Sequence, residues 1–137
     1  MENQLYQSVK QIIEKAREHT YHSVNTILLQ TYWLIGQIII EKEQGGKDTA
    51  DYGKGTLKNL SLLLTQDFGK GFDMSNLTNM RKFYLAFPIF DAVRQELSWT
   101  HYRLLSRLDT SEKRNYYLQE SIACNWNSRE LQRQINA

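Results

Sequence analysis

Apolar residues recur along this chain at the three- and four-residue spacing of amphipathic α-helices. No stretch shows the two-residue alternation of a strand, so the predicted fold class is all-α, a compact multi-helix domain. Ser98, Asp109 and Asn127 precede three of the later stripes and are predicted N-caps. The pattern predicts helices over residues 3–19, 23–43, 50–67, 74–86, 98–107, 110–124 and 128–136, and the first two could be one long helix.

The second predicted helix contains a run, Tyr32–Ile40, that is apolar on nearly every side. A membrane span needs ~18–20 continuous apolar residues, and polar residues such as Asn25 and Gln37 interrupt this segment. We therefore expect a buried central helix, with Tyr32–Ile40 as the most buried run of the chain. Gly36 indicates the close approach of another helix, because glycine otherwise costs a helix about 1 kcal/mol relative to alanine.

Residues 57–87 have the layout of a helix-turn-helix. Gly69 and Gly71 can take the positive φ angles that end one helix, and Asp73 or Ser75 can cap the next. In a DNA-binding helix-turn-helix the second helix lies in the major groove. Any helical hairpin in an all-α domain also needs a glycine turn and a polar outer face, and this segment alone fits both interpretations.

The outer side of the helix predicted over residues 74–86 is polar. At 100° per residue, it lies opposite the apolar stripe of Leu77, Met80 and Tyr84, and Leu85 also falls near it. Asparagine can read adenine and arginine can read guanine, whereas lysine, serine and threonine mostly hold phosphates. The candidate DNA-binding residues are Ser75, Thr78, Asn79, Arg81 and Lys82, with Lys54, Lys58 and Lys70 as further phosphate contacts. Arg81 could instead be structural, anchored to Asp67 or Asp73.

The charge of the chain permits a nucleic-acid partner without demanding one. The 137 residues carry a net charge of +2, and residues 51–87 are the most basic part, with five Lys/Arg against three Asp/Glu. Cys124 is the single cysteine, which excludes an internal disulfide. The N-terminal residues lack the pattern of a secretion signal, so we expect a cytoplasmic protein.

The sequence offers no evident catalytic or metal site. His19 and His22 lack further ligands at metal-site spacing and are interpreted, like His101, as surface or capping residues. Cys124 is interpreted as a small buried hydrophobic residue. Many metal-dependent nucleases place an acid two residues before a lysine, and no lysine here has one. We expect no cofactor, no metal and no catalytic residue in this chain.

Several phrases in order along the chain carry a family resemblance. They are Tyr32–Gly36, Ala50–Gly53, Phe68–Phe72, Met80–Tyr84, Leu97–Tyr102 and Trp126–Leu131. With these phrases the chain resembles the N-terminal domain of the YhcG-like family of bacterial proteins classed as PD-(D/E)XK nucleases. The resemblance implies a helical, helix-turn-helix-like domain directed to double-stranded DNA, followed in full-length relatives by a C-terminal nuclease domain.

The chain ends at Ala137, about where the resemblance places the start of the nuclease domain. We therefore expect one domain over residues 1–137, made of long helices (1–46), a helix-turn-helix-like pair (49–87) and C-terminal helices (98–137), without nuclease activity of its own. The predicted function is to position a nuclease on DNA, with weak binding by the domain alone. The alternative is a helical interaction or dimerisation module that arranges nuclease subunits, for which the exposed Leu85 and the modest charge speak.

Overall fold

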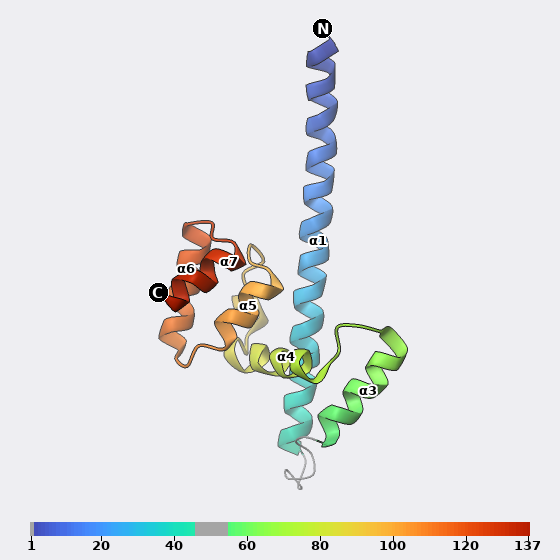
Figure 1. Ribbon diagram of the computed structural model, residues 1–137, viewed down its shortest axis with the longest axis vertical. Coiled ribbons are helices and arrows are strands. Elements are labelled where there is room, and N and C mark those ends of the chain that lie inside the picture. The colour runs from blue at the N-terminus through green and yellow to red at the C-terminus, as the bar shows by residue number, and fades with distance from the viewer. Residues whose placement is uncertain (1, 46–54) are drawn as a thin grey trace.

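The computed structural model describes residues 2–45 and 55–137 (Figure 1). The fold class is all-α, as predicted, and neither described range contains a strand. The helices are α1 (Glu2–Gly45), α3 (Leu57–Phe68), α4 (Met74–Ala86), α5 (Trp99–Ser106), α6 (Ser111–Ala123) and α7 (Ser128–Asn136), with a short 3₁₀ turn, η2 (Phe90–Ala92). Residues 50–54 of the helix predicted over 50–67 lie outside the described residues.

The two predicted N-terminal helices form one continuous helix, α1, of 44 residues. Residues 20–22, between the two predictions, hold neither glycine nor proline to end a helix. Asn25 lies within this helix, and its side-chain amide donates a hydrogen bond to the Leu97 carbonyl at 3.0 Å. Figure 1 shows α1 as a straight rod whose N-terminal half stands clear of the rest of the protein.

Helix α4 lies at the centre of the body, between α1 and α5. Gly36 of α1 packs directly on its backbone, as predicted, because a Cβ at Gly36 would lie 2.2 Å from the Met80 carbonyl oxygen. At the other end of this contact, Trp33 Nε1 donates to the Phe87 carbonyl at 2.7 Å. The contact fixes α4 with one side on α1 and its opposite side turned outward.

The core has two clusters on either side of α4. The larger one joins Leu29 of α1 and Phe83 of α4 to η2 and α5–α7, and the smaller one joins α1, α3 and α4. The expectation that Tyr32–Ile40 is the most buried run is wrong, because Leu34 and Ile38 are 49% and 56% exposed. Among the described residues, α4 contributes three side chains without exposed surface, Leu77, Met80 and Phe83. The reason is that α1 lies at the edge of the body and only one of its sides is covered.

The turns follow the sequence closely. Gly69 and Gly71 take φ angles of 81° and 108°, and the Asp73 carboxylate caps α4 by accepting from the Asn76 N–H at 2.8 Å. Ser98 and Asn127 cap α5 and α7 as predicted. The prediction of Asp109 as the cap of α6 is wrong. Thr110 caps that helix, and Asp109 instead pairs with the Lys113 ammonium at 3.0 Å.

The stretch Tyr6–Gln44 of α1 is long and apolar enough to cross a membrane by length and composition alone. Core helices of soluble proteins pass the same criterion. Here the second half of the stretch packs on α4, with Leu29, Ile39 and Ile40 buried.

Candidate nucleic-acid interface

The outward side of α4 carries Ser75, Thr78, Lys82 and Leu85. Met80 and Tyr84 face Gly36 of α1, and the helical repeat places these four residues on the opposite side of α4. Ser75, Lys82 and Leu85 are exposed, and Thr78 is half-buried. These residues lie on the outer side of α4, where the sequence places them, and the apolar Leu85 lies there too.

Two predicted base-reading residues do not belong to this surface. Asn79 is buried, with 7% of its surface exposed, because α5 covers the side of α4 on which it lies. Arg81 forms an ion pair with Glu43 of α1, with Nε–Oε distances of 2.8 and 3.0 Å. The prediction of Asn79 as an outer residue is therefore wrong, and the anchor of Arg81 is Glu43 rather than Asp67 or Asp73.

Two of the remaining candidate lysines lie outside this helix. Lys58 is exposed on α3 and Lys70 is exposed in the turn between α3 and α4. Lys54 lies outside the described residues. Of the predicted site residues, the structure brings together Ser75, Thr78 and Lys82.

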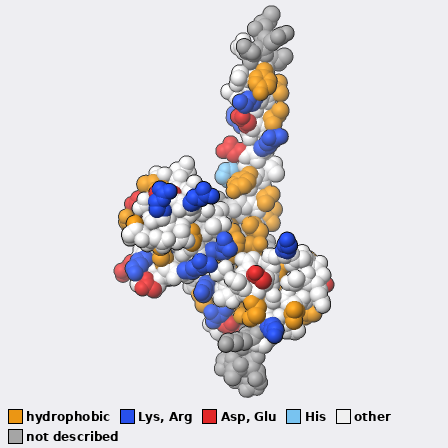
Figure 2. All heavy atoms as spheres, in the orientation of Figure 1, with side chains coloured by type: hydrophobic (Ala, Val, Ile, Leu, Met, Phe, Trp, Pro, Cys, Tyr) orange, Lys and Arg blue, Asp and Glu red, His pale blue; other side chains and the backbone are white. Residues whose placement is uncertain are grey.

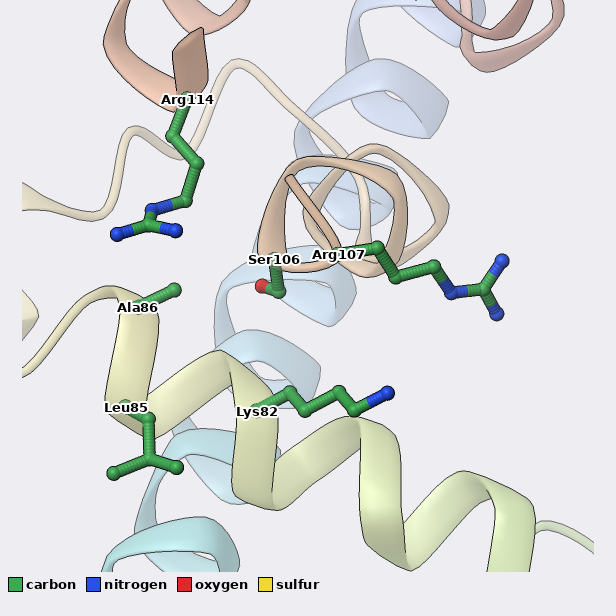
Figure 3. A pocket seen from close by; sticks show the side chains of 6 residues that line it. All are labelled: Lys82, Leu85, Ala86, Ser106, Arg107 and Arg114. Atoms are coloured by element: carbon green, nitrogen blue, oxygen red, sulfur yellow. The ribbon is translucent and has the colours of Figure 1, made fainter. Parts of the chain in front are cut away.

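Two hollows lie along the contact between α4 and α5. The first hollow, of about 300 Å³, is bordered by Ser75 and Asn79 of α4 and by Trp99 and Arg103 of α5. Further along both helices, a second hollow of about 310 Å³ opens towards the start of α6 (Figure 3). Its lining residues are Lys82, Leu85, Ala86, Ser106, Arg107 and Arg114.

Four cations border these two hollows, and we call the surface formed by Lys82, Arg103, Arg107 and Arg114 the basic groove. In Figure 3, Lys82 and Arg107 extend in the same direction from α4 and from the end of α5. Figure 2 shows Lys and Arg side chains gathered on the middle of the body, where the α5–α7 part meets α4.

The cations of the basic groove form few ion pairs, although the Asp73 carboxylate also lines the first hollow. Within residues 2–45 and 55–137, no carboxylate pairs with Lys82, Arg103 or Arg107, whereas Lys113 and Arg133 elsewhere each have an acidic partner. Arg114 Nη1 donates to the Leu108 carbonyl at 2.8 Å, which holds its guanidinium beside the second hollow without removing its charge. The arrangement favours an anionic ligand.

Two polar atoms beside the groove lack hydrogen-bond partners. Arg103 Nε and Ser106 Oγ are buried without any partner in the described part of the chain. Most buried polar atoms in proteins are paired, and an unpaired one costs about 1–3 kcal/mol. A ligand rich in acceptor oxygens would supply partners when these side chains turn towards it.

The histidines and the cysteine offer no competing site. His101 is held at both ring nitrogens, Nδ1 by Ser98 and Nε2 by the Trp126 carbonyl at 2.8 Å, whereas His19 and His22 are exposed. The described residues contain no cluster of three or more His, Cys, Asp or Glu that could hold a metal.

Cys124 is exposed, so its interpretation as a buried residue is wrong. It follows the last residue of α6, where the chain turns towards solvent. Its thiol donates to the Glu120 carboxylate, and this hydrogen bond raises the pKa of Cys124 above its ordinary value. The sulfur is therefore protonated at neutral pH and is a weak nucleophile.

Sequence reasoning missed three of the four groove cations. Arg103 and Arg107 are four residues apart, which places them on one side of α5, opposite the buried Leu105. That spacing was a usable signal for an exposed basic stripe. What the sequence did not contain was the pairing of this stripe with Lys82, because it depends on how α5 packs along α4.

The chain matches one described family and one curated relative. Residues 8–137 match the model of the DUF1016 N-terminal domain. The chain is 32% identical over 165 residues to an Escherichia coli (strain K12) protein named "Putative nuclease YhcG", an alignment that covers 96% of this chain and 44% of the relative. The chain therefore spans less than half the length of that relative. No solved structure matches it.

Proposed function

Since the chain belongs to the DUF1016 N-terminal domain family, we propose that it positions a nuclease on DNA and that the basic groove contacts the phosphate backbone. The nuclease part of the proposal rests on the name of the relative, and the DNA-contact part rests on the basic groove. The observation that carries the proposal is the convergence of Lys82, Arg103 and Arg107 on one groove without carboxylate partners in the described residues.

The contact is mainly with phosphates rather than bases. Of the two side chains on α4 that are predicted to read bases, Arg81 is paired with Glu43 and only 7% of the surface of Asn79 is exposed. Serine, threonine, lysine and arginine at the groove can all hold phosphate oxygens. The domain should therefore bind duplexes with little regard to sequence and with a Kd near the ~10⁻⁴–10⁻⁶ M of non-specific complexes.

The variant Lys82→Ala/Arg107→Ala should weaken duplex binding and its salt dependence. Each lost phosphate contact makes the slope of log K against log salt shallower by about 0.9, so the slope of the double variant should be shallower by about 1.8. Fluorescence anisotropy with a labelled duplex between about 25 and 150 mM salt measures this slope. Both side chains are exposed, so the fold should be retained.

The matched control is Lys15→Ala/Arg17→Ala. It removes the same two charges from exposed positions on the N-terminal half of α1, away from the groove. Its binding and slope should stay close to those of the parent chain. Equal losses in the two variants would show that only net charge matters, and the proposal for the groove would fail.

We propose further that the chain does not hydrolyse DNA by itself. No lysine in the sequence follows an acid by two residues, and Cys124 is a weak nucleophile. Supercoiled plasmid incubated with the chain and Mg²⁺ or Mn²⁺ should stay intact. Nicking that co-purifies with the chain and disappears when one of its carboxylates is replaced would contradict this.

A further inference from the structure

Helix α1 has a second apolar side that nothing in the described structure covers. We infer that this side is an interface with α1 of a second copy of the chain. The interface residues form a row at every third or fourth position from Tyr6 to Ile38, which we call the α1 row. Its large members are 46–62% exposed. They are Tyr6, Val9, Ile13, Val24, Ile27, Leu34 and Ile38.

The α1 row lies opposite the side of α1 that packs on the body. Leu29, Gly36 and Ile40 face α4 and the core, and the helical repeat places Ile27, Leu34 and Ile38 about half a turn away from them. This second side explains why Tyr32–Ile40 reads as apolar all round in the sequence. One side serves the core of the protomer, and the other is left for a partner.

The two threonines of the α1 row use their hydroxyl groups within the helix. Thr20 donates its hydroxyl to the Ala16 carbonyl at 3.0 Å, and Thr31 donates to the Ile27 carbonyl at 2.7 Å. These bonds back to the preceding turn satisfy the hydroxyls within the helix. Ala16 fills the remaining position with a methyl group. The α1 row therefore offers an uninterrupted surface on which another helix can pack.

The length of the row selects the occupant. Residues 6–38 span about 48 Å, more than four heptads, and apolar seams sustained over three to four heptads are typical of paired helices. The other described helices have 8–13 residues and could cover only part of it. A second α1 matches the whole length, and a two-fold axis lets the same row meet itself.

The contact is large enough for a dimer. A strip about 48 Å long and about 10 Å wide, contributed by both copies, approaches the ~1,000 Å² that a specific interface needs. The N-terminal half of α1 also needs support, because every side chain from residue 6 to residue 24 is exposed. Helices without tertiary contacts are marginal in water. Pairing through the row supplies that contact.

A bilayer is the rival for the same apolar surface. Against it, Lys10, Lys15 and Arg17 lie on the projecting half of α1, and the other half carries the protein body on its covered side. The row is also opposite the side of α1 that holds α4, whereas the basic groove lies on the far side of α4. Pairing through α1 would leave both grooves free, and this inference does not depend on DNA binding.

The test is the mass of the chain in solution, measured by sedimentation equilibrium from about 1 to 100 µM, the range of weak to moderate association. The chain has a mass of 16.2 kDa, and the dimer is expected at twice this value. The variant Ile13→Glu/Ile27→Glu places charges two heptads apart in the row and should raise the dimer dissociation constant at least about 100-fold.

The matched control is Leu62→Glu/Ile89→Glu, which introduces the same charges at exposed apolar positions outside α1. It should dimerise like the parent chain. A monomeric parent at 100 µM, or equal dissociation of both variants, would overturn the inference. Row-dependent co-sedimentation with phosphatidylcholine–phosphatidylglycerol vesicles, without self-association, would overturn it in favour of a membrane.

Circular dichroism of residual helix content identifies a variant that fails to fold. A disulfide crosslink between two copies of the Val24→Cys variant, made in a Cys124→Ser background, would support a parallel pair. Hydrogen exchange tests either orientation: the amides of residues 6–24 should become more protected as the concentration rises, and protection that does not change with concentration would contradict pairing.

Discussion

Replacing Phe83 by alanine should lower the free energy of unfolding by about 3–5 kcal/mol. Phe83 is fully buried, and its ring lies 5.3 Å from that of Trp99 and 5.1 Å from that of Tyr102, both on α5. Removing it leaves a cavity between α4 and α5, which the surrounding rings fill only partly. Because domains of this size are stable by about 5–15 kcal/mol, the loss is a large fraction of the total.

Urea unfolding followed by far-ultraviolet circular dichroism measures this loss. The control is Leu85→Ala, which truncates an apolar side chain on the exposed side of the same helix and should change stability by less than about 1 kcal/mol. Since Phe83 holds α4 against α5, its loss should also disorganise the basic groove. A Phe83→Ala variant with parental stability would contradict the packing of α4 on α5.

Replacing Gly36 by alanine should destabilise the fold by about 2 kcal/mol, although alanine is the better helix former by about 1 kcal/mol. The added methyl would lie 2.2 Å from the Met80 carbonyl oxygen and 2.9 Å from its carbon. Backbone cannot turn aside as a flexible side chain can, so α1 and α4 must separate. Separation would also strain the Arg81–Glu43 ion pair beside the contact.

Thermal and urea unfolding of Gly36→Ala give the sign of the effect directly. Gln30→Ala is the control, because it brings alanine to an exposed position of the same helix without a clash. That control should stay within about 0.5 kcal/mol of the parent. If Gly36→Ala were more stable than the parent, helix propensity would have prevailed and α1 would not approach α4 this closely.

The helices and most of their ends could be predicted because their causes are local. The spacing of apolar residues, the glycines at 69 and 71, and the capping side chains of Ser98 and Asn127 act within a few residues of themselves. The wrongly predicted cap of α6 also has a local cause: the Asp109 carboxylate pairs with Lys113 one turn ahead, and the neighbouring Thr110 caps the helix. The family resemblance was local in the same sense, since it rested on short phrases, and the family match confirms it.

What could not be predicted depends on which helices meet. Periodicity placed Asn79 near the outer side of α4, but whether that position is open depends on α5, which covers it. Arg81 pairs with an acid, Glu43, that lies 38 residues away in the chain. The basic groove has the same origin, because Lys82 and Arg107 become neighbours only when α5 packs along α4.

The apolar run of α1 shows how one sequence pattern can have two causes. Tyr32–Ile40 was interpreted as apolar because it is buried on all sides, yet Leu34 and Ile38 are half exposed. A helix that is apolar on all sides needs to be covered on all sides, but the sequence pattern does not tell whether the same chain or a partner covers it. With the row on the opposite side from α4, the interaction module considered from the sequence and the DNA-binding domain need not exclude each other.

The most direct test of DNA contact at the basic groove is a titration of the ¹⁵N-labelled chain with an unlabelled duplex, followed by amide chemical shifts at low salt. The proposal predicts that shifts concentrate on residues 75–86, 99–107 and Arg114, and that they diminish as salt rises. Shifts confined to α3 or to the N-terminal half of α1, or a spectrum unchanged at millimolar duplex, would contradict it.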